Sequence, residues 1–576
     1  YLVTEEWNMI EVNGLTGAEA FLRVLSGMGV ERIFASPGSE WSPVWEALAK
    51  PDESMPVYLS SRHEEVALAM ASGYAKSTGK LPAVMIHTTV GALHGSMALR
   101  GALHEQVPMV VFTGESIAFG EDDGPDPGGQ WMRFLSDVGG PARLVDRCVK
   151  WSFGVNDKHV LVSTIQRACQ MAMSSPRGPV FASLPIEYLF DKVTREAPLK
   201  VSMPSMPSPD PKGIDELASL LRTARNPVIV SENAGKNTGI VDRMVELAEL
   251  LNAPVVETRS SGYFNFPRDH ELHGGFEPGE FMADADVVCL IGATQPWHPA
   301  SAAQDAKVVA LDEEPLHMNL PYWGVQVDLS IAGELEASLS ALLERLRKDG
   351  VEDAAAGAER RAKLREKGAA RRAAWAEQAQ SLGSKEPMDT NWVIHQLNQV
   401  LPDDVYLVEE TITHRLAVHQ HLNRVKPGNF FSGCIGGLGT GLGTALGVKA
   451  AHPDKPVVLV IGDGTFNYNP GIAGFGFAQE FRMPILIVLM NNHGYKSMKR
   501  GIPEYYPDGW AVSTNQFVGT SIAPAPDYAA IARAFDGFGE RVQSPAEVKP
   551  ALERGLQAAK EGRLALVDLW LEPVND

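Results

Sequence analysis

Short apolar runs alternate with amphipathic segments along three stretches of the chain, at about residues 15–185, 210–346 and 388–576. The first contains "PAVMIHTT" and "VPMVVFTGE", the second "NPVIVSE" and "ADVVCLIGA", and the third "PVVLVIGDG" and "PILIVLMNN". Apolar strands that alternate with amphipathic helices predict parallel sheets covered by helices on both faces. We therefore expect an α/β protein with three doubly wound parallel-sheet domains.

Two connectors separate these stretches. "VSMPSMPSPDPKG" is rich in Pro and Ser and is typical of a linker. "EDAAAGAERRAKLREKGAARRAAWAEQAQ" is charged, Ala-rich and helix-prone, and a solvated connecting helix is favoured over a basic binding helix because the chain as a whole is acidic. We place the domains at residues 12–190, 208–345 and 388–576, with a helical linker at 346–387.

Composition narrows the class of protein. A chain of 576 residues has room for three or four domains. Its net charge of −20 argues against nucleic acid and anionic membranes as partners. The four cysteines form no C-x-x-C pair, and neither a signal-peptide pattern nor an apolar run of bilayer length is found. We expect a cytoplasmic protein whose partner is a small molecule.

Polar residues follow two apolar strands in the third stretch. The sequence Gly-Asp-Gly at 462–464 comes directly after "PVVLVI", and Asn-Asn at 491–492 comes directly after "PILIVLM". The carboxyl ends of neighbouring parallel strands meet at one edge, where open α/β sheets bind ligands. Asp463, Asn492 and the carbonyl of Gly494 would offer hard oxygen ligands that suit Mg²⁺.

The residues after this metal motif favour an anion. Gly464 and Thr465 open the predicted crossover helix, whose free N–H groups and dipole favour a diphosphate. The pattern "GDGTFNY…NN" resembles the thiamine-diphosphate signature of the enzymes related to acetolactate synthase, pyruvate decarboxylase and benzoylformate decarboxylase. The segment "NPGIAGFGFAQEFRMP" is slightly longer than is usual in that family, with the extra residues near 470–476. The resemblance implies that thiamine diphosphate and Mg²⁺ bind here.

A glycine-rich stretch, "GGLGTGLGTALG" at 436–447, also fits a dinucleotide-binding G-x-G-x-x-G loop. That interpretation requires a solid strand directly before the glycines, whereas "NFFSGCI" is short and interrupted by polar residues. The resemblance instead places this stretch at the aminopyrimidine ring of the cofactor, where the carbonyl of Gly436 would accept from the ring's amino group and Leu438 would hold the cofactor bent. The predicted cofactor-binding set also includes Thr411, Gly437, Gly462 and Tyr495.

The first stretch carries a candidate acid in "SSRHEEVALAMASGYAKSTGK". Glu64 begins a helix whose apolar positions indicate burial, and a buried carboxyl can exchange protons near neutral pH. From composition alone, a carboxylate that interacts with the helix dipole is the favoured alternative. The string is similar to the family pattern "HEQGAAHMADGYARATGK", which implies that Glu64 protonates the aminopyrimidine ring and also binds the cofactor. Glu65 replaces the usual Gln of that pattern, and we give it no catalytic role.

Two patches resemble benzoylformate decarboxylase more than acetolactate synthase. "FASPGSEWSPVW" places Ser39 where that enzyme binds the substrate carboxylate, and "MIHTTVGALHGSMALRGALHEQVPMVVFTGE" places His87 at its active-site histidine. An imidazole at a strand end can donate to a carboxylate or move a proton, although a hydrogen-bonded structural histidine is the plain alternative. "FPRDHELHGG" matches a generic family stretch and makes His270 a third candidate catalytic residue.

The resemblance, which spans about residues 14–574, implies a pyrimidine-binding, a central and a diphosphate-binding domain in that order. It implies a lyase that decarboxylates a 2-oxo acid, aromatic acids included, through an enamine intermediate, with carboligase activity. An acetolactate synthase-type transferase is the first alternative; a diketone hydrolase, a nucleotide-binding oxidoreductase and a cofactor-binding protein without catalysis stay open.

The resemblance also bears on assembly. In this family the cofactor lies between subunits, with Glu64 from one and Asp463 from the other, so we expect a homodimer or a homotetramer. The sequence does not decide whether the central domain binds FAD, as it does in some acetolactate synthases. It also leaves the substrate side chain and the acyl acceptor open.

Overall fold

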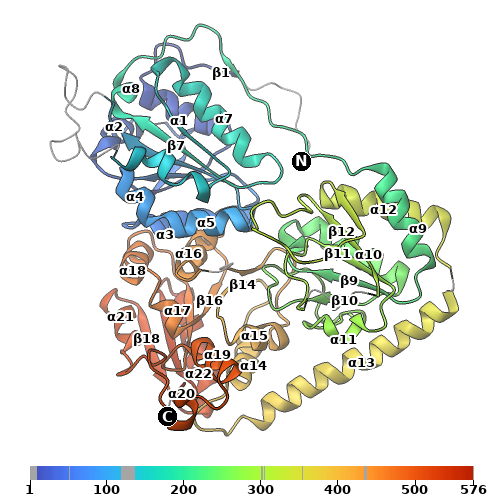
Figure 1. Cartoon of the computed structure of the whole chain (residues 1–576). Coiled ribbons are helices and arrows are strands. Elements are labelled where there is room, and N and C mark those ends of the chain that lie inside the picture. The colour runs from blue at the N-terminus through green and yellow to red at the C-terminus, as the bar shows by residue number, and fades with distance from the viewer. Residues whose placement is uncertain are drawn as a thin grey trace. The chain divides into compact units, whose positions relative to one another are not determined.

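The computed structural model describes residues 9–50, 52–117, 137–299, 303, 305–352, 354–433 and 437–574. The chain divides into two compact units. The first unit comprises Tyr1–Ser205, Cys434–Pro453 and Asn467–Met483, and the second comprises Met206–Gly433, Asp454–Phe466 and Pro484–Asp576. Figure 1 shows parallel sheets with helices packed around them. The predicted α/β architecture with three doubly wound sheets is confirmed.

A six-stranded parallel sheet forms the core of the first unit, with strand order β3-β2-β4-β5-β7-β6. Strand β4 is buried at every position, as expected for an apolar run covered on both faces. A capping box between Thr16 and Glu19 starts helix α1. The strands are β2 Arg32–Ser36, β3 Val57–Ser60, β4 Ala83–Ile86, β5 Met109–Glu115, β6 Trp151–Gly154 and β7 Pro179–Pro185, with an antiparallel pair β1 Met9–Ile10 and β8 Leu199–Lys200. The helices are α1 Gly17–Gly27, α2 Ser42–Leu48, α3 Glu64–Thr78, α4 Thr88–His94, α5 Ser96–His104, α6 Pro141–Leu144, α7 Leu161–Met173 and α8 Ile186–Phe190.

The second unit contains a five-stranded parallel sheet with order β10-β9-β11-β12-β13. Its helices begin with good caps: Asp210 accepts the N–H of Lys212 before α9, and Asn237 accepts the N–H of Gly239 before α10. The strands are β9 Pro227–Ser231, β10 Val255–Glu257, β11 Val287–Ile291, β12 Lys307–Asp312 and β13 Leu329–Ala332. The helices are α9 Pro211–Thr223, α10 Thr238–Leu251, α11 Gly279–Met282 and α12 Leu335–Asp349.

The C-terminal sheet has six parallel strands in the order β15-β14-β16-β17-β19-β18. The strands are β14 Tyr406–Glu410, β15 Phe430–Ser432, β16 Val457–Gly462, β17 Leu486–Asn491, β18 Phe538–Val542 and β19 Ala565–Trp570. The helices of this part of the chain are α14 Thr390–Val400, α15 Arg415–His421, α16 Gly441–Ala451, α17 Asp463–Phe466, α18 Gly471–Glu480, α19 Lys496–Tyr505, α20 Trp510–Thr514, α21 Tyr528–Ala534 and α22 Val548–Lys560.

The N-terminal and C-terminal sheets share one topology. Numbered along each sheet's own segment, both have the strand order 2-1-3-4-6-5. In both, the strand order reverses between the first and third strands, because the connections that follow them run to opposite sides of the sheet. These strands are β2 and β4 in one sheet and β14 and β16 in the other. Ligands of open α/β sheets bind outside the carboxyl ends of the strands at this divergence, the topological switch point. Each of the two sheets therefore presents one such edge.

Glycines of the sequence "GGLGTGLGTALG" allow two helices of the first unit to pack closely. A Cβ added to Gly447 of α16 would lie 2.0 Å from the carbonyl oxygen of Met70 in α3, and one added to Gly73 of α3 would lie 2.0 Å from the carbonyl oxygen of Thr444. A side chain at either position would overlap with backbone. Gly447 therefore serves the packing of α16 on α3, which accounts for a glycine at that position without a dinucleotide loop.

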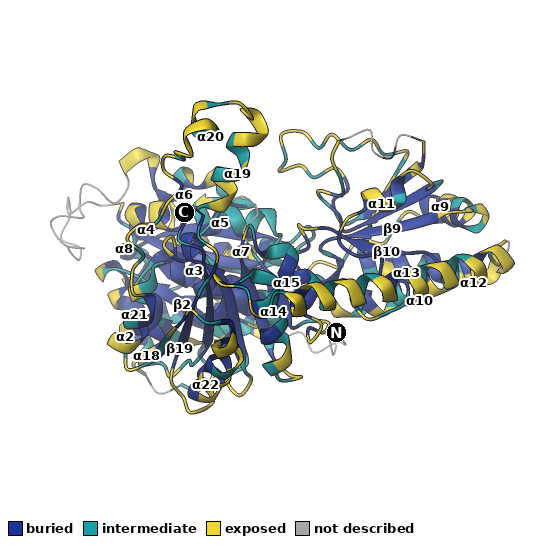
Figure 2. Cartoon of the chain, turned by 90° about the horizontal axis from the view of Figure 1, so that it is seen from below, coloured by how far each residue is buried: buried dark blue, intermediate teal, exposed yellow. Residues whose placement is uncertain are grey.

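The Ala-rich connector forms helix α13, Ala354–Ser381, as expected. Figure 2 shows much of its length exposed. Its basic residues nevertheless hold it to the central sheet region: Arg361 pairs with Glu271, and the guanidinium of Arg371 donates to the carbonyl of His273 at 2.7 Å. The helix is thus a connector braced on one side by ion pairs and hydrogen bonds.

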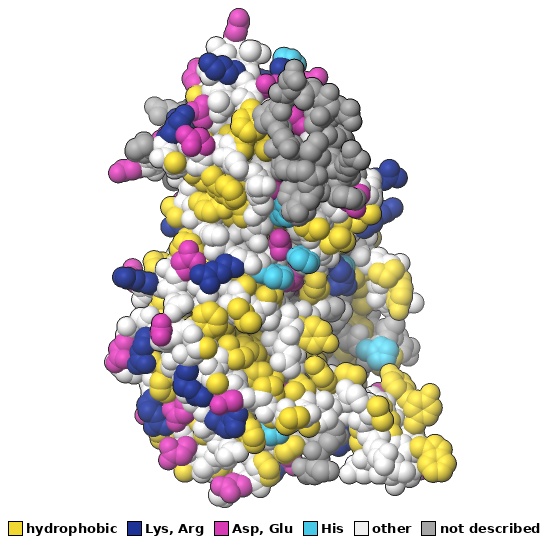
Figure 3. All heavy atoms as spheres, turned by 90° about the vertical axis from the view of Figure 1, so that its left-hand side faces the viewer, with side chains coloured by type: hydrophobic (Ala, Val, Ile, Leu, Met, Phe, Trp, Pro, Cys, Tyr) yellow, Lys and Arg dark blue, Asp and Glu magenta, His cyan; other side chains and the backbone are white. Residues whose placement is uncertain are grey.

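Charged side chains of both signs lie on the face of the molecule that Figure 3 draws. On the face drawn in Figure 3, acidic and basic side chains of the described residues are interspersed and form no continuous basic surface. No helix among the described residues is both long enough and apolar enough to cross a membrane.

Candidate functional site

Three neighbouring strands of the C-terminal sheet deliver polar residues to one edge. Glu410 of β14 pairs with Ile461 of β16, and Gly462 of β16 pairs with Met490 of β17. The residues that follow these strands are Thr411, Asp463 and Asn492. All three therefore leave the sheet at its carboxyl edge, beside the switch point between β14 and β16.

The carboxylate of Asp463 is buried at this edge of the sheet, which is electrostatically unfavourable. Its side chain is buried, and burial raises its pKa to about 7, against the effect of hydrogen bonds from backbone N–H groups. Its Oδ2 accepts the N–H of Gly494 at 3.1 Å. A bound divalent cation would compensate the desolvated carboxylate.

Asn492 presents an unpaired acceptor at the same edge. The residue is 3% exposed, and its Oδ1 has no hydrogen-bond partner among the described residues. Buried side-chain oxygens are rarely left in that state unless a ligand completes them. A carboxylate that lacks a counter-charge and an amide oxygen that lacks a partner fit Mg²⁺, which prefers such oxygens. Because the N–H of Gly494 donates to Asp463, the predicted metal ligands Asp463, Asn492 and Gly494 lie together at this edge of the sheet.

The predicted start of the crossover helix is wrong in one respect. Helix α17 holds Gly464 and Thr465 but is a single turn, and the crossover resumes as α18 only after Pro470. A single turn has too few aligned peptides for a sizeable dipole, so any anion here relies on the backbone N–H groups alone. Gly464 has a steric role as well, because a Cβ there would lie 2.8 Å from the ring of Tyr495.

Thr411 lies at the same edge, but its polar groups are engaged. Its backbone N–H and its hydroxyl both donate to the buried carboxylate of Glu409, which also accepts from Arg415 and Ser432. The hydroxyl therefore keeps only its acceptor lone pairs for a ligand, and it cannot donate to a phosphate in this arrangement.

The glycine-rich stretch supplies three predicted cofactor-binding residues, Gly436, Gly437 and Leu438. Gly436 lies outside the described residues. Gly437 lies against α5, where an added Cβ would be 2.0 Å from Cε of Met97. Leu438 is half-buried. Both belong to the first unit, together with Glu64.

The N-terminal sheet brings Ser39, Glu64 and His87 to its own carboxyl edge. Ser39 follows β2, Glu64 follows β3 and His87 follows β4, and these three strands are adjacent in the sheet. A Cβ added to Gly38 would lie 2.1 Å from Nδ1 of His87, so glycine is required for the Ser39 loop to approach the imidazole. The structure thus gathers three of the four predicted catalytic residues at one switch point.

Glu40 is a member of this group that the sequence reasoning missed. Its carboxylate is 2% exposed, and Oε2 accepts from Nδ1 of His87 at 2.8 Å. A carboxylate partner fixes the tautomer and the orientation of an imidazole. The acid in "PGSEW" was a visible signal, but only the pairing of β2 with β4 shows that it meets the histidine.

Glu64 is buried at the first turn of α3. Its Oε2 lies 3.2 Å from Nδ1 of His94, and its side chain packs beside Gly91 of α4. The ligand atoms of His63, Glu64 and His94 lie within 4.8 Å of one another. Nδ1 of His63, however, accepts the N–H of Glu65 as the cap of α3, so the three residues do not form a ready metal site.

His270 has other partners. Its Nδ1 accepts the N–H of Leu272 at 3.1 Å, and its Nε2 lies 3.5 Å from the carboxylate of Glu249 on α10. Both ring nitrogens are therefore engaged next to the central sheet. These contacts account for the residue structurally, and its catalytic role stays a prediction.

The switch point of the central sheet is filled by the protein's own carboxylate. Glu232, which follows β9, is fully buried and accepts the N–H groups of Thr294 and Gln295 at 2.6 and 2.8 Å and the hydroxyl of Thr258 at 2.5 Å. Burial raises its pKa. Glu232 thus occupies the position, and binds the N–H groups, that a dinucleotide phosphate would use at this switch point.

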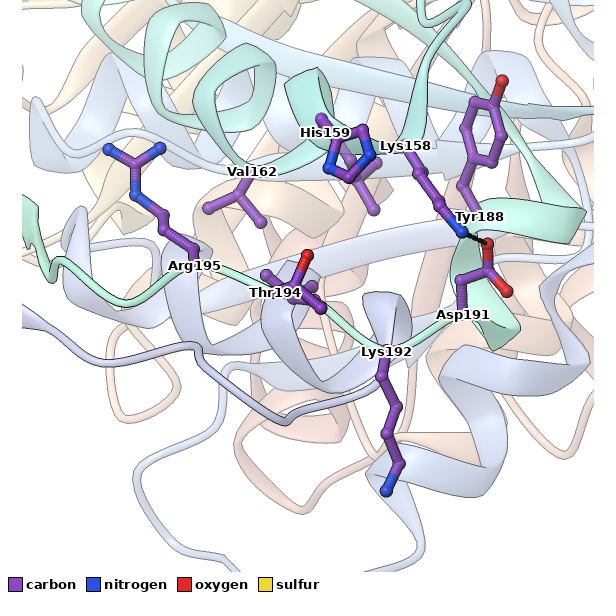
Figure 4. Close-up of a pocket in the computed structure, with 10 residues that line it drawn as sticks. Lys158, His159, Val162, Tyr188, Asp191, Lys192, Thr194 and Arg195 are labelled. Carbon is purple, nitrogen blue, oxygen red and sulfur yellow. Dashed lines mark hydrogen bonds and ion pairs between the residues drawn. The ribbon is translucent and has the colours of Figure 1, made fainter.

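A further pocket lies at the start of α7 (Figure 4). Lys158 reaches across it to Asp191 at 3.0 Å, while Lys192 points away from it. The third Lys or Arg residue that lines this pocket, Arg195, donates to the carbonyl of Ala197 at 3.1 Å, so the three cations give no basis for assigning a ligand.

Comparisons with known proteins identify the family of this chain. Family models described as the N-terminal TPP binding domain, the central domain and the C-terminal TPP binding domain of thiamine pyrophosphate enzymes match residues 15–126, 214–342 and 412–569. Acetolactate synthase isozyme 3 large subunit from Escherichia coli (strain K12) is 26% identical, covering 97% of this chain and 95% of that protein. Benzoylformate decarboxylase from Pseudomonas aeruginosa is 25% identical, covering 96% and 99%.

Solved structures share the fold. The benzoylformate decarboxylase of Polynucleobacter necessarius matches with a TM-score of 0.79 at 20% identity, over 96% of this chain and 98% of that one. A 4-hydroxybenzoylformate decarboxylase of Rhodococcus jostii RHA1 matches with a TM-score of 0.78 at 22% identity, over 97% and 99%. At these identities the similarity establishes the fold alone.

Proposed function

The chain belongs to the thiamine pyrophosphate enzymes, and from this premise we propose that it is a thiamine-diphosphate- and Mg²⁺-dependent lyase that decarboxylates a 2-oxo acid. Asp463 and Asn492, with Gly494, would hold the metal and through it the diphosphate. When bound, thiamine diphosphate supplies the electron sink for cleavage of the bond to the carboxylate. Glu64, buried at the start of α3, would hold a proton at the aminopyrimidine ring.

The hydrogen bond between His87 and Glu40 is the observation that carries the choice of a decarboxylase. In a decarboxylase, the carbon that loses CO₂ must then receive a proton. In a synthase, that carbon instead bonds to a second oxo compound. With Nδ1 donating to Glu40, Nε2 of His87 would be the nitrogen that exchanges a proton. Ser39, in the same loop as Glu40, would donate to the substrate carboxylate.

An acetolactate synthase-type reaction is the second candidate, because a relative of that name is as similar to this chain as the decarboxylase relative. Both candidates share the cofactor site and differ in what happens after CO₂ leaves. As an assembly we propose a homodimer or homotetramer whose sites lie between subunits, and we propose no FAD, since Glu232 fills the central switch point.

A panel of 2-oxo acids tests this function. We expect benzoylformate and related acids to release CO₂ and an aldehyde, only when thiamine diphosphate and Mg²⁺ are present. Formation of 2-hydroxy-2-methyl-3-oxo acid from pyruvate, without free aldehyde from any acid, would favour the synthase instead. Product identity by mass spectrometry separates the two outcomes.

Replacing Glu40 by Gln should lower kcat for decarboxylation about 10- to 100-fold, the range typical of partners that orient a functional histidine. The amide keeps the shape of the side chain but no longer stabilises one imidazole tautomer and its protonated form. We expect the affinity for thiamine diphosphate to stay unchanged and the pH profile of kcat to shift.

Glu46→Gln is the matched control, because Glu46 is an exposed acid in the following helix. A Glu40→Gln enzyme with wild-type kcat and an unshifted pH profile would show that Glu40 takes no part in proton transfer.

A further inference from the structure

His414 is a buried imidazole that touches the predicted metal site. It lies directly before α15 and is 6% exposed. Its Nδ1 lies 2.8 Å from Oγ1 of Thr390, and its Nε2 lies 3.3 Å from Nδ2 of Asn492. Three parts of the chain, the first turn of α14, the residue before α15 and the loop after β17, therefore meet in one hydrogen-bonded series.

We propose that His414 is a positioning residue, which accepts the amide N–H of Asn492 at Nε2 and thereby turns Oδ1 of Asn492 toward the cation held by Asp463. The proposal rests on the proposed function, since it concerns how this chain prepares its Mg²⁺ site. The side chain of Asn has two orientations of nearly the same shape, and only one of them presents an oxygen to the metal. The reverse orientation would point an NH₂ group at the cation, which is repulsive.

The hydroxyl of Thr390 supports this orientation. A neutral imidazole carries one N–H, and the nitrogen without it accepts. When Nδ1–H donates to Thr390, Nε2 keeps its lone pair and can accept only from the NH₂ group of Asn492. That arrangement leaves Oδ1 of Asn492 buried without a protein partner, which is the state observed. His414 and Thr390 thus account for an otherwise costly unpaired oxygen.

The backbone of the loop after β17, which carries Asn492, is held in place by contacts that do not involve His414. The side chain of the preceding residue, Asn491, donates to Asp568 at 2.8 Å, and the carbonyl of Asn492 accepts the N–H of Val574 at 2.9 Å. Loss of the imidazole should therefore release the amide of Asn492 while the loop keeps its course.

The test measures Mg²⁺ affinity by isothermal titration calorimetry on the full-length protein at saturating thiamine diphosphate. We expect His414→Leu to weaken Mg²⁺ binding about 10- to 100-fold, as is usual for residues that orient a metal ligand. His421→Leu is the matched control: His421 is a buried histidine at the end of α15, but its Nε2 lies 3.2 Å from Oδ1 of Asn391. That variant should bind Mg²⁺ like the wild type.

A double-mutant cycle separates orientation from general damage. In Asn492→Asp the two carboxylate oxygens are equivalent, so no partner is needed to choose between them. Adding His414→Leu to Asn492→Asp should then change Mg²⁺ affinity less than about threefold, well below the loss expected for the single variant. If His414→Leu does not fold, as judged by circular dichroism, Thr390→Val replaces it, with a smaller loss in the same direction.

Two results overturn the inference and are distinguishable from failure of the proposed function. If the wild type shows Mg²⁺-dependent binding of thiamine diphosphate and the affinity is unchanged in His414→Leu, or the loss is equal with Asn492→Asp, His414 does not orient the ligand. If the wild type binds no thiamine diphosphate at any Mg²⁺ concentration, both the proposed function and the inference fall.

Discussion

Replacing Glu64 by Gln should lower the rate of 2-oxo acid decarboxylation by about 10²- to 10⁴-fold, the usual contribution of a group that transfers a proton. Glu64 is buried at the first turn of α3, where its carboxylate faces His94. Gln has the same shape and can still donate a hydrogen bond, but it cannot exchange a proton. Affinity for thiamine diphosphate and Mg²⁺ should stay within a few-fold of the wild type, because Glu64 is not a predicted metal ligand and Gln keeps a hydrogen bond to the cofactor's ring.

The neighbouring residue provides the control for this experiment. Glu65 is buried as well, and the resembled family has Gln at its position, so Glu65→Gln should leave kcat nearly unchanged. Steady-state kinetics and cofactor titration on both variants give the comparison. A Glu64→Gln enzyme with normal kcat, or an equal loss in both variants, would contradict the role given to Glu64.

Replacing Asp463 by Asn should abolish function by a different route, through loss of the cofactor. We expect the affinity for thiamine diphosphate in the presence of Mg²⁺ to fall by at least about 100-fold, since a charged ligand is lost and not merely its orienting partner. The buried carboxylate is the group at this edge whose charge a cation would neutralise, since burial raises its pKa to about 7.

Tryptophan fluorescence or calorimetry during titration with thiamine diphosphate measures this loss. Asp454→Asn is the matched control, because Asp454 is an exposed aspartate shortly before the opposite end of β16. Wild-type affinity in Asp463→Asn would place the metal elsewhere, and recovery at a modest excess of Mg²⁺ would indicate that Asp463 is only a peripheral ligand.

The sequence predicts the sheets well because apolar strands and amphipathic helices have different periods. The meeting of Asp463 and Asn492 at one edge is predicted for the same reason, since both follow strands that pair in parallel. The common 2-1-3-4-6-5 order of two sheets was not predictable, because strand order depends on packing between segments far apart in the chain. No sequence repeat accompanies it.

The residues that orient the site were missed for a related reason. Glu40 becomes a partner of His87 only because β2 lies beside β4, and His414 reaches Asn492 only because β14 lies beside β16 and β16 beside β17. Neither residue stands in a motif of its own. The single-turn helix α17 was also unpredictable from the periodicity, because four residues make about one turn and the hydrophobic repeat of a helix shows only over several turns.

A crystal structure of the full-length protein with thiamine diphosphate and Mg²⁺ tests the central claim most directly. We predict that oxygens of Asp463 and Asn492 ligate the Mg²⁺ that binds the diphosphate, and that Glu64, from the same or a second copy of the chain, contacts the aminopyrimidine ring of the same cofactor molecule. A cofactor whose diphosphate binds away from Asp463, or whose ring has no contact with any Glu64 in the assembly, would contradict the account.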